Sequence, residues 1–207
     1  MGRDMRIWFA TGNLHKKREL ESILIKDMNV PCTIVIPKDT GLKFDPEETG
    51  NSFVENALIK ASALYELVKE PVIADDSGIC VDALDGKPGI YSARYGGEGL
   101  KDAERNDLLL NELGKNINRR ARFVCAMVLY YSPYRYYLAQ ETMEGVIVES
   151  TRDAKGSGGF GYDPILFIPE VNCTVAELSD VDKNHLSHRG KAARAIAKFL
   201  NGSSNDF

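Results

Sequence analysis

Residues 5–16 read Met-Arg-Ile-Trp-Phe-Ala-Thr-Gly-Asn-Leu-His-Lys, an apolar run that passes directly into a polar turn. The run over residues 5–10 is short and apolar, which predicts a buried strand. From Asn13 to about Asp27 the apolar residues recur at helical spacing, and residues 33–36 form a second apolar run. The order strand, helix, strand predicts an α/β fold with parallel pairing near the N-terminus.

Apolar spacing predicts further elements along the chain. Residues 122–131 are apolar on both alternating faces, which is typical of a central strand covered on both sides. The turn Ser132-Pro133-Tyr134 favours an antiparallel return over residues 135–140. The other expected strands are 71–74, 79–84 and 144–148, and the other expected helices are 52–69, 100–113 and 187–200.

Composition narrows the class of protein. A chain of 207 residues with 43% hydrophobic and 27% charged residues predicts one ordinary globular domain, 1–207, possessing one or two lobes. The net charge of -4 argues against a nucleic-acid polymer as main partner, because binding a phosphate backbone requires a basic face, but it allows a single nucleotide. No signal peptide or apolar span is evident, and the four cysteines form no Cys-x-x-Cys, so we expect a cytoplasmic protein with no membrane partner.

The segment Thr11–Lys16 lies where the first predicted strand enters its helix. Exposed amides at a helix start bind anions, Gly12 lets the backbone approach a ligand, and Lys16 can direct its ammonium at a phosphate. The alternative is a turn in which Asn13 caps the helix beside a solvated lysine. No Gly-x-x-x-x-Gly-Lys-Ser/Thr occurs in the chain, which argues against the P-loop kinases and NTPases.

Adjacent carboxylates, Asp75 and Asp76, end a predicted strand, and Ser77-Gly78 is expected to form a turn after them. Two neighbouring carboxylates repel each other unless a cation or proton compensates, and magnesium is the natural compensator beside phosphates. Side chains alternate along a strand, so only one of the pair should face a given cleft. Glu47 and Glu48 could supply a second carboxylate, or they could simply form an acidic helix start.

Two later segments carry candidate nucleoside contacts. The loop Gly158–Pro164 bears Phe160 and Tyr162, which can stack on a base or pack as ordinary aromatic residues. The literal Gly-x-Gly-x-x-Gly at residues 156–161 follows no strong strand and runs into Tyr-Asp-Pro, so it is not a dinucleotide fingerprint. Ser187 can cap the final helix and place His188 and Arg189 in the first turn, where cations oppose the helix dipole unless an anion or a carbonyl offsets them.

Taken together, and in this order along nearly the whole chain, these segments resemble the inosine/xanthosine triphosphate pyrophosphatase family. The resemblance implies a two-lobed α/β fold with a long central mixed sheet, flanking helices and an active-site cleft between the lobes. It further implies a homodimer that uses Mg²⁺ to hydrolyse ITP, dITP and XTP to monophosphate and pyrophosphate, which cleans the nucleotide pool. The segments that carry it are Thr11–Lys16, Glu47–Gly50, Phe53–Ala57, Ala74–Gly78, Gly86–Arg94, Gly158–Pro164 and Ser187–Arg189.

The same resemblance implies roles for individual residues. Asp76 would be the general base or a metal ligand, Glu47 or Glu48 a further ligand, and Asp75 a support. The phosphates would be held by Thr11, Gly12, Asn13, Leu14, His15, Lys16 and Lys60. The nucleoside would be contacted by Ser77, Phe160, Gly161, Tyr162, Asp163, Lys183, His188 and Arg189.

The chemistry of the bases supports such selectivity. Hypoxanthine and xanthine present a carbonyl at the 6-position, whereas adenine presents an amine. Donors from Arg189 or the loop amides would pair with the carbonyl and meet the amine donor to donor. Three other functions fit part of the pattern: a sister pyrophosphatase for modified pyrimidine or other nucleotides, a non-catalytic nucleotide sensor that needs no carboxylates, and phosphoryl transfer to an acceptor.

Overall fold

The computed structural model describes residues 5–202, so the predicted domain 1–207 extends past the described chain at both ends. The chain divides into two compact units. Unit 1 comprises residues 5–76, 125–141 and 189–202, and unit 2 comprises residues 77–124 and 142–188. None of the helices in the described part is long and apolar enough to cross a bilayer.

A mixed sheet runs through the described residues, with the strand order β2-β1-β3-β4-β5-β6-β7. β1 pairs in parallel with β2 and β3, whereas β6 pairs antiparallel with β5 and β7. The α/β class and the mixed sheet are therefore as predicted. The strands are β1 (Met5–Phe9), β2 (Cys32–Val35), β3 (Val72–Val81), β4 (Arg120–Ser132), β5 (Arg135–Ile147), β6 (Leu166–Ile168) and β7 (Cys173–Thr174).

Helices flank the strands. The α-helices are α1 (Leu14–Asp27), α2 (Phe53–Val68), α3 (Asp102–Leu113), α4 (Asp180–Leu186) and α5 (His188–Gly202). Short 3₁₀ helices are η1 (Pro37–Thr40), η2 (Asp82–Leu84), η3 (Gly89–Arg94) and η4 (Val175–Glu177). The predicted helices at residues 13–27, 52–69 and 187–200 are confirmed to within two residues at each end.

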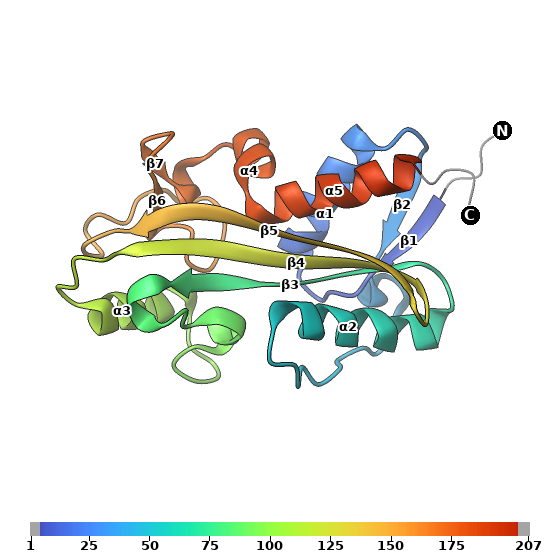
Figure 1. The fold of residues 1–207 in the computed structure, drawn as a ribbon, viewed down its shortest axis with the longest axis horizontal. Helices are drawn as coiled ribbons and strands as arrows, with labels where there is room; N and C mark the ends of the chain where they lie inside the picture. The colour runs from blue at the N-terminus through green and yellow to red at the C-terminus, as the bar shows by residue number, and fades with distance from the viewer. Residues whose placement is uncertain (1–4, 203–207) are drawn as a thin grey trace. The chain divides into compact units, whose positions relative to one another are not determined.

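In unit 1 the alternation of side chains along β1 builds two cores. Ile7 and Phe9 pack in one cluster with α1 and α5, and Trp8 and Ala10 pack in another with α2. α1 and α5 therefore cover one face of this part of the sheet and α2 the other (Figure 1). β4 alternates in the same way, with Met127 in the first cluster, as expected for a strand buried on both faces.

In unit 2 a separate core gathers around β3, β4 and α3. Ile79, Leu109, Phe123, Ile165 and Leu166 belong to it, and each is buried. Full burial of such a side chain contributes about 1.5–3 kcal/mol. Tyr162 belongs to this core, so the loop that bears Phe160 and Tyr162 is anchored in it.

The turn predicted after Asp76 is wrong, because β3 continues through Asp75, Asp76, Ser77 and Gly78 to Val81. Glycine at position 78 allows residues 89–92 to approach the strand closely. A Cβ at that position would lie 2.4 Å from both the carbonyl oxygen of Gly89 and Oγ of Ser92. The runs at 135–140 and 144–148 also prove to be one strand, β5.

Candidate active site

The alternation of side chains along β3 separates the two aspartates. Asp75 makes its contacts with α1 and α5, and Asp76 makes its contacts with α2. Each carboxylate therefore contacts its own groups, and the charges of Lys16 and Lys60 act on both, which allows two adjacent aspartates to lie within one strand.

Asp75 is the centre of a buried charge network. Lys16 Nζ lies 2.9 Å from its Oδ1, and Arg189 Nε lies 3.1 Å from its Oδ2. Arg189 Nη1 in turn contacts Glu19 Oε2 at 2.6 Å. Burial alone would raise the pKa of Asp75, but Lys16 and Arg189 outweigh it and hold that pKa well below the ordinary value. The Cys125 thiol also faces Oδ2, at 3.9 Å, and burial raises its pKa to about 12, so it stays protonated.

Asp76 is surrounded differently. Asn56 Nδ2 donates to Oδ2 at 3.2 Å, and Lys60 Nζ lies 3.5 Å from Oδ1. The same ammonium lies 2.8 Å from Glu48 Oε1, so one lysine bridges the two carboxylates. Burial raises the pKa of Asp76, with Lys60 and Lys16 opposing it, which gives a carboxylate more basic than a free one. Burial would lower the pKa of Lys60, but the carboxylates of Asp76, Asp75 and Glu48 together raise it.

Glu47 and Glu48 differ in exposure and in contacts. In the extended segment before α2 the side chains alternate, with Glu47 exposed and Glu48 half-buried at Lys60. The structure thus brings Glu48 to Asp76 and leaves Glu47 facing solvent.

The turn before α1 has features of both a capped helix start and an anion-binding turn. Asn13 caps the helix: its Oδ1 accepts hydrogen bonds from the amides of His15 and Lys16, at 2.8 and 3.3 Å. Thr11 Oγ1 accepts from the Asn13 amide at 3.1 Å. In the part of the chain that the structure describes, the amides of Gly12 and Leu14 have no hydrogen-bond partner and remain available to an anion. Lys16 is not solvated, since its side chain is 16% exposed and bound to Asp75.

Unit 2 holds a second group of predicted residues. Asp163 Oδ2 accepts from the Phe160 amide and from Lys183 Nζ, each at 2.9 Å. The Lys183 ammonium lies 5.0 Å from the centre of the Phe160 ring. From α3, Asp102 accepts from the Gly161 amide at 2.7 Å. These contacts hold the loop in one conformation with Phe160 half-buried.

Tyr162 and His188 are packed rather than open. Tyr162 is 4% exposed within the core of unit 2, and its hydroxyl donates to the carbonyl of Ser92 at 2.9 Å. The packed-aromatic alternative thus describes Tyr162, and Phe160 remains the candidate for stacking on a base. His188 begins α5 and stacks on Phe123, with ring centres 4.9 Å apart. Ser77 lies half-buried in β3.

Several residues of the site were not predicted. Asn56 precedes Lys60 by one helical turn, and Glu19 follows Lys16 by three residues, so helical spacing could have pointed to both. Cys125 and Asp102 carried no local signal, because their contacts link residues 50 and 59 positions apart.

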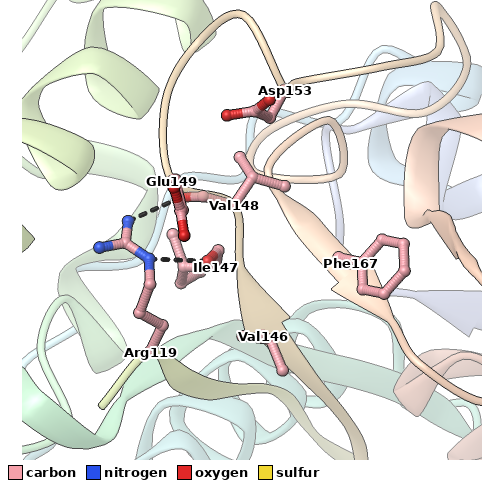
Figure 2. A pocket seen from close by; sticks show the side chains of 7 residues that line it. All are labelled: Arg119, Val146, Ile147, Val148, Glu149, Asp153 and Phe167. Atoms are coloured by element: carbon pink, nitrogen blue, oxygen red, sulfur yellow. Dashed lines mark hydrogen bonds between the residues drawn. The ribbon is translucent and has the colours of Figure 1, made fainter. Parts of the chain in front are cut away.

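A pocket of about 310 Å³ in unit 2 has no candidate site residue in its lining (Figure 2). Figure 2 shows Arg119 at its edge, where Nε donates to the carbonyl of Ile147 at 2.9 Å and Nη2 to that of Val148 at 2.6 Å. Nη1 donates to the carbonyl of Gly114 at 2.9 Å, so this guanidinium joins backbone segments instead of facing a ligand.

Fold and site together define an α/β protein in which Lys16, at the turn before α1, and Lys60, on α2, contact two adjacent carboxylates within β3, a combination suited to a polyanion. The Ham1 family model matches residues 7–199, and the chain belongs to the Ham1 family. The predicted family resemblance is thereby confirmed.

Relatives and solved structures agree with this membership. The "dITP/XTP pyrophosphatase" of Treponema denticola is 51% identical over 202 residues, which are 96% of this chain and 100% of the relative. The Ham1 protein of Staphylococcus aureus superposes with a TM-score of 0.84 at 37% identity, covering 96% of this chain and 99% of that one. The HAM1 protein of Coxiella burnetii gives a TM-score of 0.86 at 34% identity with the same coverage.

Proposed function

We propose that this protein hydrolyses ITP, dITP and XTP to the monophosphate and pyrophosphate, and thereby cleans the nucleotide pool. The observation that carries the proposal is the Lys60 ammonium between Glu48 and Asp76, 2.8 and 3.5 Å from their oxygens. Relatives that align along nearly the whole chain are named dITP/XTP pyrophosphatases. The activity is that of a hydrolase acting on an acid anhydride.

The turn before α1 is the proposed phosphate site. The amides of Gly12 and Leu14 and the ammonium groups of Lys16 and Lys60 supply donors for a triphosphate. Lys16 Nζ lies 2.9 Å from Asp75 Oδ1. When Lys16 turns to a phosphate, Arg189 still compensates Asp75, so the buried carboxylate is never left without a cation.

The carboxylates fit a divalent cation. Asp76 and Glu48 offer hard oxygen donors that already share one cation, and Mg²⁺ characteristically binds one or two carboxylates together with substrate phosphates. We therefore assign Asp76 and Glu48, in preference to Glu47, as the residues that would hold Mg²⁺. When bound, the ion neutralises charge on the phosphates.

Asp76 is the proposed general base. Its carboxylate takes a proton from a water molecule, the water oxygen bonds to the α-phosphorus, and the bond from that phosphorus to the bridging oxygen breaks, so pyrophosphate leaves. Asn56 holds the Oδ2 oxygen of Asp76 in place during this transfer.

Unit 2 supplies the proposed nucleoside contacts. The Phe160 ring can stack on a base, and its position is held by the shared contact of Asp163 with the Phe160 amide and Lys183. The contacts of Ser77, Gly161 and His188 with the nucleoside stay predictions. A direct role for Arg189 on the base also stays a prediction, and its bonds to Asp75 and Glu19 favour a positioning role.

The test is pyrophosphate release from ITP, dITP, XTP, ATP, dUTP and methylated dTTP at equal concentration. We expect the deaminated purines to be cleaved faster by orders of magnitude than ATP. Equal rates for ATP and ITP would remove the proposed specificity, and a preference for the pyrimidines would indicate the sister enzyme. Orthophosphate as first product would favour phosphoryl transfer, and binding without turnover would favour a sensor.

We also propose a domain organisation, an oligomeric state and a cellular location. A single domain is supported because β3, β4 and β5 each contribute residues to both compact units. A homodimer rests on the family resemblance, and sedimentation at the monomer mass of 22.9 kDa would refute it. A cytoplasmic location without nucleic-acid partners is supported by the free cysteines and the net charge of -4.

A further inference from the structure

The buried side chain of Asn56 joins two parts of the candidate site. Its Nδ2 donates to Asp76 Oδ2 at 3.2 Å, and its Oδ1 accepts from the Gly50 amide at 2.9 Å. The residue is 0% exposed, so water cannot replace either bond. One planar amide thus connects β3 to the segment that carries Glu48, which lies two residues before Gly50.

That segment is held tightly to the start of α2. A Cβ at Gly50 would lie 2.7 Å from Asn56 Oδ1 and 2.9 Å from the Asn56 amide nitrogen, so the backbones approach closely. Ser52 caps α2 by accepting from the Glu55 amide at 3.1 Å, and Glu55 accepts from the Asn51 amide at 2.6 Å. The cap fixes the helix start independently of the Asn56 side chain.

Asn56 and Lys60 lie one turn apart on α2, and both contact Asp76, but through different interactions. Lys60 supplies charge from the end of a long flexible stem. Asn56 has two side-chain torsions and directs one donor and one acceptor in fixed directions. Its loss would leave a buried carboxylate oxygen and a partly buried amide unpaired together.

We propose that Asn56 is a positioning residue that sets the relative placement of Glu48 and Asp76 for a divalent cation. The inference rests on the proposed function, because it assigns those two carboxylates as the ligands. Hydrogen-bonding partners of metal ligands typically change metal affinity by about 10–100-fold when they are removed. Asn56 is such a partner for Asp76 directly, and through the Gly50 amide it also holds the segment that carries Glu48.

The experiment measures Mn²⁺ binding to the whole protein by electron paramagnetic resonance of the free ion, which requires no turnover. Asn56→Leu keeps the number of side-chain heavy atoms and the branch at Cγ, although it is bulkier, and it removes both hydrogen bonds. We expect it to bind Mn²⁺ at least about tenfold more weakly than wild type. The matched control is Ser52→Ala, which weakens the same helix start without touching Asp76 and should bind within about twofold of wild type. Asn56→Ser, which keeps one hydroxyl, should lie between and replaces Asn56→Leu if circular dichroism shows that variant to be unfolded.

The inference is overturned if the folded Asn56 variants bind Mn²⁺ as wild type does. Equal losses in Asn56→Leu and Ser52→Ala overturn it as well, because general loosening of the helix would then explain the effect. A wild-type protein that binds Mn²⁺ but releases no pyrophosphate from ITP would refute the proposed function and leave the positioning role standing.

Discussion

Replacement of Asp75 by asparagine tests the charge network at the centre of unit 1. The change keeps the shape of the side chain and removes its charge. Asp75 is 1% exposed and its partners Lys16 and Arg189 are 16% and 3% exposed, so neither cation can recover full hydration when the carboxylate is lost. Glu19, 2.6 Å from Arg189 Nη1, would still contact the guanidinium.

The magnitude follows from burial. Removing one partner of a buried ion pair costs about 3–5 kcal/mol of the free energy of unfolding, whereas an exposed pair contributes about 0–1 kcal/mol. Asp39→Asn is the matched control: Asp39 lies 2.7 Å from Lys17 Nζ, but its side chain is 38% exposed. For a chain of this size each kcal/mol lowers Tm by about 2–4 °C, so Asp75→Asn should lose about 6–20 °C.

The assay is urea unfolding followed by circular dichroism at pH 7, with both variants beside wild type. The pKa of Asp75 in the folded protein lies below the ordinary carboxyl value of 3.8, so its stabilisation is fully present above that value. The stabilisation is lost as the pH falls toward the folded pKa, and the gap between wild type and Asp75→Asn should narrow there. A loss at pH 7 below about 1 kcal/mol, or no larger than that of Asp39→Asn, would refute the reasoning.

Three further outcomes are expected. Asp76→Asn should abolish pyrophosphate release while substrate binding, measured by calorimetry, is retained, and surviving turnover would exclude Asp76 as base. Gly78→Ala should destabilise the protein by about 1–3 kcal/mol in urea, because the new Cβ meets backbone and side-chain oxygen at 2.4 Å; wild-type stability would contradict that close approach. Lys183→Met removes the buried partner of Asp163 and the cation over Phe160, so KM for ITP should rise about tenfold, as expected for a lost charged hydrogen bond; an unchanged KM would separate this loop from substrate binding.

Local patterns in the sequence predicted much of the fold. The apolar run over residues 5–10 and the helical spacing after Asn13 specify β1 and α1, and the cap by Asn13 follows from the chemistry of its short side chain. The alternation in residues 122–131 correctly indicated a strand covered on both faces. Each of these signals is complete within about fifteen residues, so no distant partner is needed to interpret it.

Elsewhere the local signal was misleading or absent. Asp-Asp-Ser-Gly favours a turn by its own chemistry, yet the chain stays extended there because charges from α1, α2 and α5 compensate the two aspartates. β6, β7 and α4 are three, two and seven residues long, too short to show a period. The packing of Tyr162 in a core was likewise invisible, because aromatic residues in a glycine-rich loop fit both burial and stacking.

The sequence by itself determined the fold class, the family and the kinds of groups available at the site, since these depend on short motifs and their order. Only the tertiary structure decided which group meets which. Lys16 and Arg189 reach Asp75 across 59 and 114 residues, and Asn56 reaches Asp76 across 20. It also selected Glu48 over Glu47 at Lys60. The physical reason is that charge compensation and hydrogen bonding act through space over a few ångströms, whereas the periodicity of a sequence reports only on neighbours along the chain.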